Sequence, residues 1–276
     1  MEKTGYLGPK GTFTQQAAAI LAPQTEFVPL RDIKEIFDTV DNGLCNIGIA
    51  PIENSTGGSV NATLDALLAS SVLITELLVM PICHAIMSNS AAPQKVLAHP
   101  QALAQCREYL RENFANIPQI TCSSNGEAAA IASKDSTVAA IAPIYAAKEY
   151  SLNILGKNIQ DSAVNSTSFI KVEKEEKSTK NDNTTSKTQN YRTTIAFSTE
   201  NRPGSLCKIL GIFDHYHINM SKILSRPNPA RLGEYIFFVD IENYNALDAK
   251  KSLNKIKHAD NITMYKFLGE YPTKNP

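Results

Sequence analysis

Short apolar segments alternate with amphipathic segments along the first 172 residues. In residues 33–40, for example, apolar side chains recur three or four positions apart, which is the spacing of one helix face. Strands that alternate with helices are typical of an α/β fold, with a mostly parallel sheet and helices on both faces. The pattern predicts strands at residues 6–8, 27–30, 46–51, 73–80, 83–87, 96–98, 120–122 and 138–142, and helices at residues 15–22 (capped by Thr14), 33–40, 61–69, 102–114, 126–133 and 144–150.

The last 86 residues show a different order of elements. Their pattern predicts strands at 192–198, 218–224, 235–242 and 262–268, and helices at 204–216 and 245–256. The resulting order β-α-β-β-α-β is that of a ferredoxin-like domain.

A polar segment separates the two patterns. Residues 173–190 contain no apolar side chain, so they cannot offset the entropy lost on ordering, and they are expected to form a flexible linker. Residues 1–172 carry a net charge of −4, and residues 173–276 carry a net charge of +4. We therefore expect a body at 1–172 and a separate domain at 191–276, and cleavage within the linker should leave a folded body.

Composition narrows the class of protein. The 27 basic and 27 acidic residues balance, so neither a nucleic-acid nor a membrane-surface partner is expected. The apolar run at 77–81 is too short to span a bilayer, and no leader sequence is recognised at the N-terminus. The five cysteines are scattered without ligand spacing, which favours reduced thiols in the cytoplasm over a disulfide framework or a metal site.

The segment GPKGTF, residues 8–13, lies between a predicted strand and a predicted helix. Glycines allow the backbone to approach a ligand closely, and a helix start offers free N–H donors to an anion. The same segment is equally compatible with an ordinary strand-to-helix turn.

The segment PIENSTGGSV, residues 51–60, follows the end of a buried strand. Loops at the carboxyl ends of parallel strands carry ligands, and Glu53 and Asn54 can hydrogen-bond a polar substrate. Alternatively, these side chains only cap a turn.

The segment HPQALAQC, residues 99–106, also follows a strand. Gln101 and Gln105 are four residues apart and therefore share one helix face. A single histidine such as His99 is more often structural than catalytic.

The segment DSAVNSTSFI, residues 161–170, brings two hydroxyls and an amide to the start of the last strand of the body. By itself, it is also compatible with an ordinary polar turn.

In this order, the four segments resemble those of prephenate dehydratase with a C-terminal ACT regulatory domain. The resemblance extends into the last domain, where RPGSLCKIL (202–210) and LSRP (224–227) are similar to the effector motifs of the family. It implies a two-lobed, periplasmic-binding-protein-like α/β body followed by a ferredoxin-like ACT domain.

The sequence departs from the family pattern at four positions. Ser168 stands where the family has the arginine of Thr-Arg-Phe, and Ala98 where it has a serine before His-Pro-Gln. Ser205 replaces an alanine and Leu224 a glutamate in the effector motifs. Lys10 is the nearest cation in a motif that can replace the missing arginine.

The resemblance implies that the protein converts prephenate to phenylpyruvate in L-phenylalanine biosynthesis, without metal or cofactor. Thr167 would donate a hydrogen bond to the departing hydroxyl. Glu53, being acidic beside an anionic substrate, would act only when protonated or by orienting a neighbour. Implied substrate-binding residues are Gly11, Thr12, Phe13, Asn54, Ser55, Gln101, Gln105, Ser168 and Phe169.

The ACT resemblance implies feedback inhibition by L-phenylalanine, bound where two such domains pair in a homodimer or homotetramer. A glycine at a helix start lets the effector carboxylate approach the backbone. Implied effector-binding residues are Gly204, Ser205, Leu206, Asn219, Ser225 and Arg226.

Three other functions remain open. Arogenate dehydratase performs the same chemistry on a substrate with an amine in place of the keto group. A protein without the family's arginine, as here with Ser168, could also be a non-catalytic amino-acid sensor on the same scaffold. A periplasmic solute receptor shares the two-lobed fold but requires export.

Overall fold

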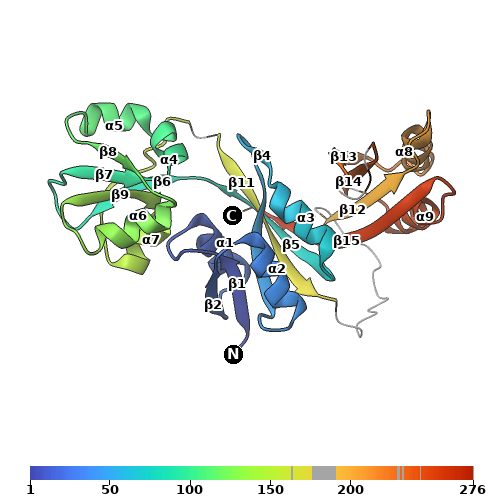
Figure 1. Ribbon diagram of the computed structural model, residues 1–276, viewed down its shortest axis with the longest axis horizontal. Coiled ribbons are helices and arrows are strands. Elements are labelled where there is room, and N and C mark those ends of the chain that lie inside the picture. Colours follow the sequence, from blue (N-terminus) through green and yellow to red (C-terminus); the bar gives the residue numbers. More distant parts are fainter. Residues whose placement is uncertain (163, 176–190, 229–230, 232, 243, 276) are drawn as a thin grey trace. The chain divides into compact units, whose positions relative to one another are not determined.

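The computed structural model describes residues 1–162, 164–175, 191–228, 231, 233–242 and 244–275 (Figure 1). Most of the expected linker, residues 176–190, therefore lies outside the described residues. The chain divides into two compact units. The first consists mainly of Met1–Ala66 and Leu78–Lys174, and the second of Leu67–Leu77 with the described residues from Glu175 to Lys274.

The first unit has two lobes, each built on its own sheet. In the first lobe the strand order is β2-β1-β3-β11. Its elements are β1 (Lys3–Leu7), α1 (Phe13–Leu21), β2 (Glu26–Leu30), α2 (Ile33–Asp41), β3 (Ile47–Asn54), β4 (Gly58–Ser59), α3 (Asn61–Ala69) and β11 (Ser166–Lys174). Strands β2, β1 and β3 are parallel, whereas β11 runs antiparallel to β3.

Alternating residues explain why helices cover both faces of this sheet. Tyr6 and Ile49 are buried in a cluster with the alanines of α1. Their neighbour Gly48 points to the other face, where a Cβ atom would meet Ile36 and Val40 of α2. Successive strand residues face opposite sides, so α1 and α2 pack on opposite faces.

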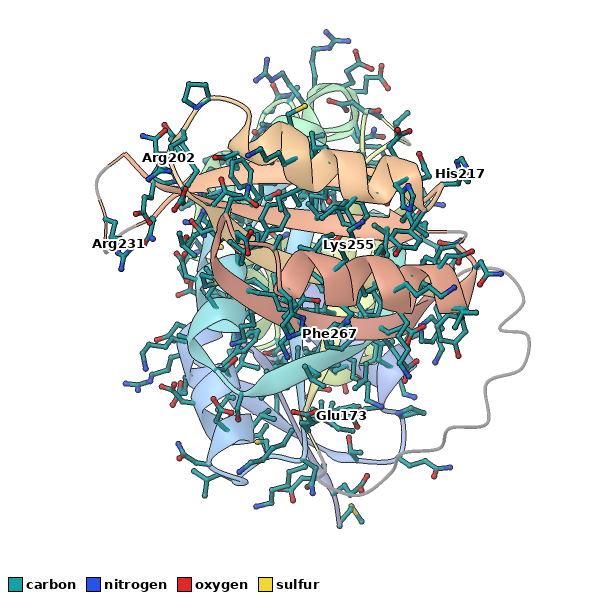
Figure 2. All side chains as sticks on the ribbon, turned by 90° about the vertical axis from the view of Figure 1, so that its right-hand side faces the viewer. Glu173, Arg202, His217, Arg231, Lys255 and Phe267 are labelled. Carbon is teal, nitrogen blue, oxygen red and sulfur yellow. The ribbon has the colours of Figure 1, made fainter. Side chains whose placement is uncertain are left out.

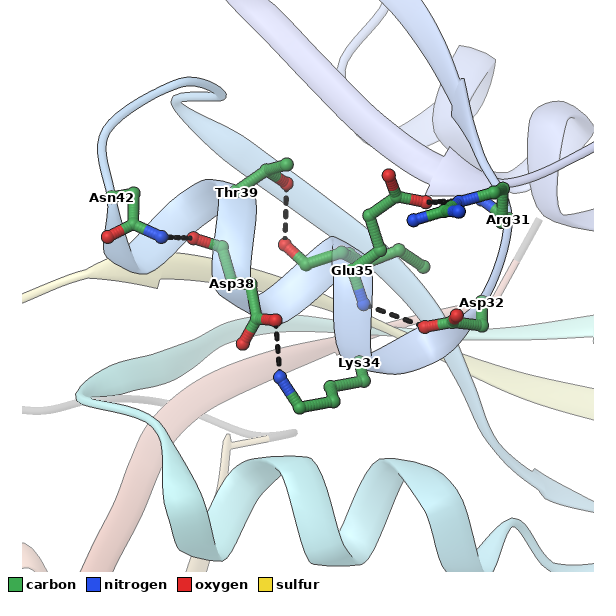
Figure 3. Close-up of polar contacts among 8 residues, drawn as sticks. Arg31, Asp32, Lys34, Glu35, Asp38, Thr39 and Asn42 are labelled. Carbon is green, nitrogen blue, oxygen red and sulfur yellow. Dashed lines mark hydrogen bonds and ion pairs between the residues drawn. The ribbon is translucent and has the colours of Figure 1, made fainter.

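Helix α2 follows directly from its local sequence (Figure 3). The Asp32 carboxylate caps the helix by accepting from the Glu35 N–H at 2.8 Å, and Lys34 pairs with Asp38 one turn later at 2.5 Å. At the other end, the Asn42 amide donates to the Asp38 carbonyl at 2.8 Å. Such exposed ion pairs contribute little, and the buried apolar face holds the helix in place.

The second lobe, drawn in shades of green in Figure 1, has the strand order β10-β6-β9-β7-β8. Small side chains fill its core, so helices approach the sheet closely. Its elements are β6 (His84–Ser88), β7 (Lys95–Ala98), α4 (Pro100–Gln105), α5 (Arg107–Asn113), β8 (Gln119–Thr121), α6 (Asn125–Ala132), β9 (Val138–Pro143), α7 (Ile144–Tyr150) and β10 (Asn153–Lys157). The chain crosses between the lobes twice, and the Ile82 N–H of one crossing donates to the Asn165 carbonyl of the other at 2.9 Å.

The second unit contains the predicted β-α-β-β-α-β order. Helices α8 and α9 lie side by side on one face of its sheet (Figure 2), and the Lys255 amine lies 5.9 Å from the centre of the Tyr216 ring. The elements are β12 (Tyr191–Thr199), α8 (Ser205–His215), β13 (Met220–Pro227), β14 (Tyr235–Glu242), α9 (Ala246–Lys257) and β15 (Ile262–Lys274). The predicted fold class, a two-lobed α/β body with a ferredoxin-like domain, is therefore confirmed.

The segment Leu67–Leu77 packs within the second unit, although the sequence pattern assigns it to the body. It includes the first part of β5 (Val72–Pro81), whose last residues belong to the first unit. The Lys266 ammonium donates to the carbonyls of Leu68, at 2.8 Å, and Ser70. A long strand thus passes from one unit into the other.

Two predicted elements differ from those observed. Helix α1 begins at Phe13 and is capped by Thr12, whose hydroxyl accepts from the Gln15 N–H, and not by Thr14. The helix predicted at 102–114 is broken at Cys106 into α4 and α5. Strand β10 was not predicted, because residues 153–157 lack a marked apolar pattern. No helix among the described residues is long and apolar enough to cross a membrane.

We expect Gly269→Ala to destabilise the protein, because the added Cβ would overlap the backbone of Ile74 and φ is +149°. The expected loss is about 1–3 kcal/mol. Gly211→Ala is the matched control: nothing lies near its Cβ position within α8, so stability should rise by about 0.5–1 kcal/mol. Thermal and urea unfolding measure both changes. An equal change in the free energy of unfolding for the two variants would contradict the close contact of Gly269 with the Ile74 backbone.

Candidate active site

A cavity of about 180 Å³ opens in the first unit between its two lobes. Residues from helices and strands of both lobes and from the crossings between them line it. They are Phe13, Thr14, Pro51, Asn54, Ile82, His84, His99, Gln101, Ala102, Gln105, Asn125, Asn165, Thr167 and Phe169. Of the residues expected at a substrate site, six therefore lie together: Phe13, Asn54, Gln101, Gln105, Thr167 and Phe169.

Asn54 and Thr167 form the polar pair at one side of the cavity. They face each other across β3 and β11, and the Asn54 amide nitrogen donates to the Thr167 hydroxyl oxygen at 2.8 Å. The Asn54 amide oxygen accepts from the N–H groups of Thr56 and Gly57, which fixes the amide's orientation. Because the Thr167 oxygen accepts from Asn54, the hydroxyl retains its own proton for a group bound in the cavity.

Asn165 extends this network. Its amide oxygen accepts from Asn54 at 3.1 Å and from the Ser55 hydroxyl at 3.3 Å. The Ser55 hydroxyl also accepts from the Ser166 N–H at 3.0 Å. Ser55 is exposed and does not line the cavity, so it supports Asn165 from behind.

A register shift in the β3–β11 pair determines which side chains face the cavity. Thr167 pairs with Asn54 and Ser168 with Glu53, but Phe169 pairs with Pro51. The extra residue on β3 lets Pro51 and Asn54 share a face with Thr167 and Phe169. Glu53 and Ser168 do not line the cavity, because they point to the other face of the sheet. An arginine at position 168 would therefore also point away from the cavity.

The loop before α1 is packed rather than open to a ligand. The Gly11 N–H donates to the Gln15 amide oxygen at 2.5 Å, and Gly11, with φ at +77°, abuts the ring of Tyr150. Gly11 and Thr12 do not line the cavity. Instead, Phe13 and Thr14 bring the first turn of α1, with its free N–H groups, to the cavity. Lys10 pairs with Glu149 at 3.3 Å and does not line the cavity.

In the second lobe, local caps orient two further polar side chains. The His99 Nδ1 atom accepts from the Gln101 N–H at 3.2 Å and so caps α4. The Asn125 amide oxygen accepts from the His99 N–H at 2.9 Å. The Asn125 amide nitrogen is therefore the group left to donate into the cavity.

The helix break at Cys106 positions Gln105. Asp161, distant in sequence, accepts from the N–H groups of Arg107 and Glu108 at 3.1 and 3.0 Å and so caps α5. Its own N–H donates to the Gln105 carbonyl at 2.7 Å. Gln105 is thereby held at the end of α4, and its amide oxygen lies 2.9 Å from His84 Nε2.

Among the residues that the structure describes, those that line the cavity include no lysine, arginine, aspartate or glutamate. The polar groups are amides, hydroxyls and two imidazoles, and burial lowers the pKa of His84 and favours its neutral form. The described residues include no group of three His, Cys, Asp or Glu side chains that could hold a metal. Burial raises the pKa of Cys106 to about 12, so this thiol is not a nucleophile at neutral pH.

Several lining residues were not among those expected. His99 and Asn165 lie within the motif segments 99–106 and 161–170, and Thr14 immediately follows the motif segment 8–13. His84, Asn125 and Ile82 lie outside every such segment. Only the packing of the two lobes brings them to the cavity, so no sequence pattern could have indicated them.

A second cavity, of about 130 Å³, lies within the second unit. Ser205 and Leu206 line it, and Gly204, the N-cap residue of α8, lies next to them in the chain with φ at +81°. Asn219, Ser225 and Arg226 do not line it. The remaining lining residues are Thr199, Glu200, Asn201, Arg202, Gly233, Glu234, Tyr235 and Phe237.

Comparison with known proteins identifies the family. Residues 4–177 match the prephenate dehydratase family, and residues 193–256 match the ACT domain. The chain is 37% identical over 276 residues to a bifunctional chorismate mutase/prephenate dehydratase of Aquifex aeolicus, covering 98% of this chain and 73% of that protein. It is 34% identical over 274 residues to a prephenate dehydratase of Methanocaldococcus jannaschii, covering 97% of both chains.

Two solved structures show the same fold over nearly the whole chain. A prephenate dehydratase of Arthrobacter aurescens in complex with L-Phe has a TM-score of 0.80 and 28% identity, covering 98% of this chain and 90% of that chain. The quorum-quenching acylase GqqA has a TM-score of 0.86 at 20% identity, covering 99% and 98%, and is similar in fold alone. On the family matches and the identities over whole chains, this protein belongs to the prephenate dehydratase family and carries an ACT domain.

Proposed function

We propose that this chain converts prephenate to phenylpyruvate in the cavity between the lobes of its first unit. The observation that carries the proposal is the Thr167 hydroxyl, whose oxygen accepts from Asn54 while its proton remains available to a bound group. The alternative of a non-catalytic sensor would need no such oriented donor.

The reaction requires one proton and no redox partner. The ring C–O bond breaks and the hydroxyl leaves as water after receiving a proton. The bond between the ring and its carboxylate breaks as well, and its electron pair completes the aromatic ring as CO₂ departs. Thr167 stabilises the departing oxygen by donating a hydrogen bond, with the net proton supplied by solvent.

The substrate is a dianion, and the cavity offers it donors without formal cations. We propose that the amides of Gln101, Gln105 and Asn125, with the N–H groups at the start of α1, bind the carboxylates. The rings of Phe13 and Phe169 border the site and limit its access to water. No carboxylate among the lining residues is available for an ammonium group, which favours prephenate over arogenate.

The other expected residues have indirect roles in this proposal. Ser55 supports Asn165, and Gly11 and Thr12 form the packed turn that starts α1. Glu53 and Ser168 face the opposite side of the sheet, so we assign neither of them contact with the substrate.

The direct test is an assay for phenylpyruvate with the full chain, using prephenate and arogenate separately. Phenylpyruvate formed from prephenate supports the proposal, and turnover of arogenate alone would replace it with the sister reaction. Tight binding of prephenate without turnover would favour the sensor.

We expect Thr167→Ala to lower kcat at least about 100-fold, the typical loss when one oriented donor is removed. Thr167→Ser keeps a hydroxyl and is the matched control, with an expected loss below about tenfold. Steady-state kinetics and thermal unfolding separate catalysis from folding. An alanine variant with nearly normal kcat would contradict the role of Thr167.

We expect Ser168→Arg, which restores the family residue, to leave kcat and KM for prephenate within about twofold. The reason is that position 168 faces away from the cavity, opposite Glu53. Gln101→Arg, which places the same side chain in the cavity, should change KM about tenfold or more. A large decrease in KM for Ser168→Arg would show that this position contacts the substrate.

We further propose that L-phenylalanine inhibits the enzyme through the ACT domain, with paired chains forming a homodimer or homotetramer. The Arthrobacter relative is in complex with L-Phe, and in this chain Ser205 and Leu206 line a cavity beside Gly204. We propose that Asn219, Ser225 and Arg226 contact the effector where two ACT domains pair.

We also propose a cytoplasmic location, because the five cysteines are free thiols, as is usual in a reducing compartment.

We expect Leu206→Gln to weaken L-phenylalanine binding about tenfold or more, because it removes apolar contact with the effector ring. Uninhibited kcat should stay within about twofold. Leu247→Gln on α9, where the side chain is 61% exposed, is the matched control and should bind normally. Calorimetry and inhibition curves measure both variants, and unchanged binding by Leu206→Gln would move the effector site elsewhere.

A further inference from the structure

Of the two histidines in the catalytic cavity, His84 is the buried one, with 2% of its surface exposed. It begins β6, immediately after the chain crosses into the second lobe. Its N–H donates to the Gln160 amide oxygen at 3.0 Å, and its carbonyl accepts from the Ile159 N–H at 3.1 Å. The ring lies edge-on to Phe13 at 5.4 Å. Backbone and ring are thus both held in place.

The imidazole has one polar partner among the described residues. Nε2 lies 2.9 Å from the Gln105 amide oxygen, and the buried Nδ1 atom has no hydrogen-bond partner there. A neutral imidazole donates from one nitrogen only. The amide oxygen can only accept a hydrogen bond, so this contact requires the proton on Nε2.

This contact determines what Gln105 presents to the cavity. With its oxygen engaged by His84, the amide has its two N–H donors left for other partners. The opposite orientation would present an oxygen, which repels a carboxylate. Gln105 has no formal charge, so its value to an anionic substrate depends entirely on this orientation.

We propose that His84 is a positioning residue, which holds the Gln105 amide with its N–H groups toward a substrate carboxylate. The proposal rests on the proposed function, because it takes the ligand to be the prephenate dianion. His84 acts through Gln105, so its loss should raise KM and leave kcat nearly unchanged.

Two conservative variants separate the ring nitrogens. In His84→Gln the side-chain nitrogen reaches the position of Nε2, and in His84→Asn it reaches that of Nδ1. We expect KM within about threefold of wild type for His84→Gln, and a rise of about tenfold or more for His84→Asn, the usual effect of losing a hydrogen bond to a charged group. The reverse order would overturn the proposal.

A double-mutant cycle tests whether the effect passes through Gln105. His84→Leu should raise KM about tenfold in the native chain, but by less than about twofold when Gln105→Leu is already present. Independent, additive effects would overturn the proposal. Thermal unfolding establishes that each variant is folded. If His84→Leu is not folded, the comparison of His84→Gln with His84→Asn tests the proposal instead.

A spectroscopic measurement tests the contact between His84 and Gln105 independently of enzyme activity. In ¹⁵N-histidine spectra of the full chain, His84 should be the Nε2–H tautomer, and Gln105→Leu should shift its Nε2 signal. An Nδ1–H tautomer, or a signal indifferent to Gln105→Leu, would overturn the inference. An inactive wild-type chain would overturn the proposed function, while these spectra would still decide how His84 and Gln105 interact.

Discussion

The pairing of β3 with β11 is the constraint on which the cavity between the two lobes depends. It joins segments more than a hundred residues apart and aligns Asn54 with Thr167, and its register shift brings Pro51 to the same face as Phe169. Without this register shift, the Pro51 side chain would turn to the side of the sheet opposite Asn54, because strand residues alternate. The orientation of the Thr167 hydroxyl is thus a consequence of backbone hydrogen bonding.

The neutral lining of the cavity makes the orientation of each polar group important. A dianion is usually met by arginine or lysine, but this cavity is lined by neutral groups. Neutral donors bind an anion well only when they are oriented in advance, since an amide turned the wrong way repels it. The structure provides that orientation: the turn after β3 fixes Asn54, His99 fixes Asn125, and His84 contacts Gln105. The absence of an arginine at position 168 therefore leaves the lining unchanged.

The second unit is built from two separate parts of the chain. The helices and strands of the second unit follow the predicted β-α-β-β-α-β order, yet this unit also contains Leu67–Leu77 from within the body. Lys266 and Gly269 on β15 contact the backbone of this segment. The following residues of β5 lead to Ile82 and His84 at the cavity. Strand β5 therefore runs from the second unit into the first.

The sequence by itself determined most of the element types, the fold class of an α/β body followed by a ferredoxin-like domain, and six of the cavity residues. These depend on local periodicity and on motifs that remain contiguous, such as the segment around Asn54 and that around Thr167. Only the tertiary structure decided that Glu53 and Ser168 face away, that His84 and Asn125 belong to the cavity, and that Leu67–Leu77 packs with the second unit. The physical reason is that strand register and helix breaks depend on distant partners: β11 imposes the register of β3, and Asp161 caps the helix that begins after Cys106.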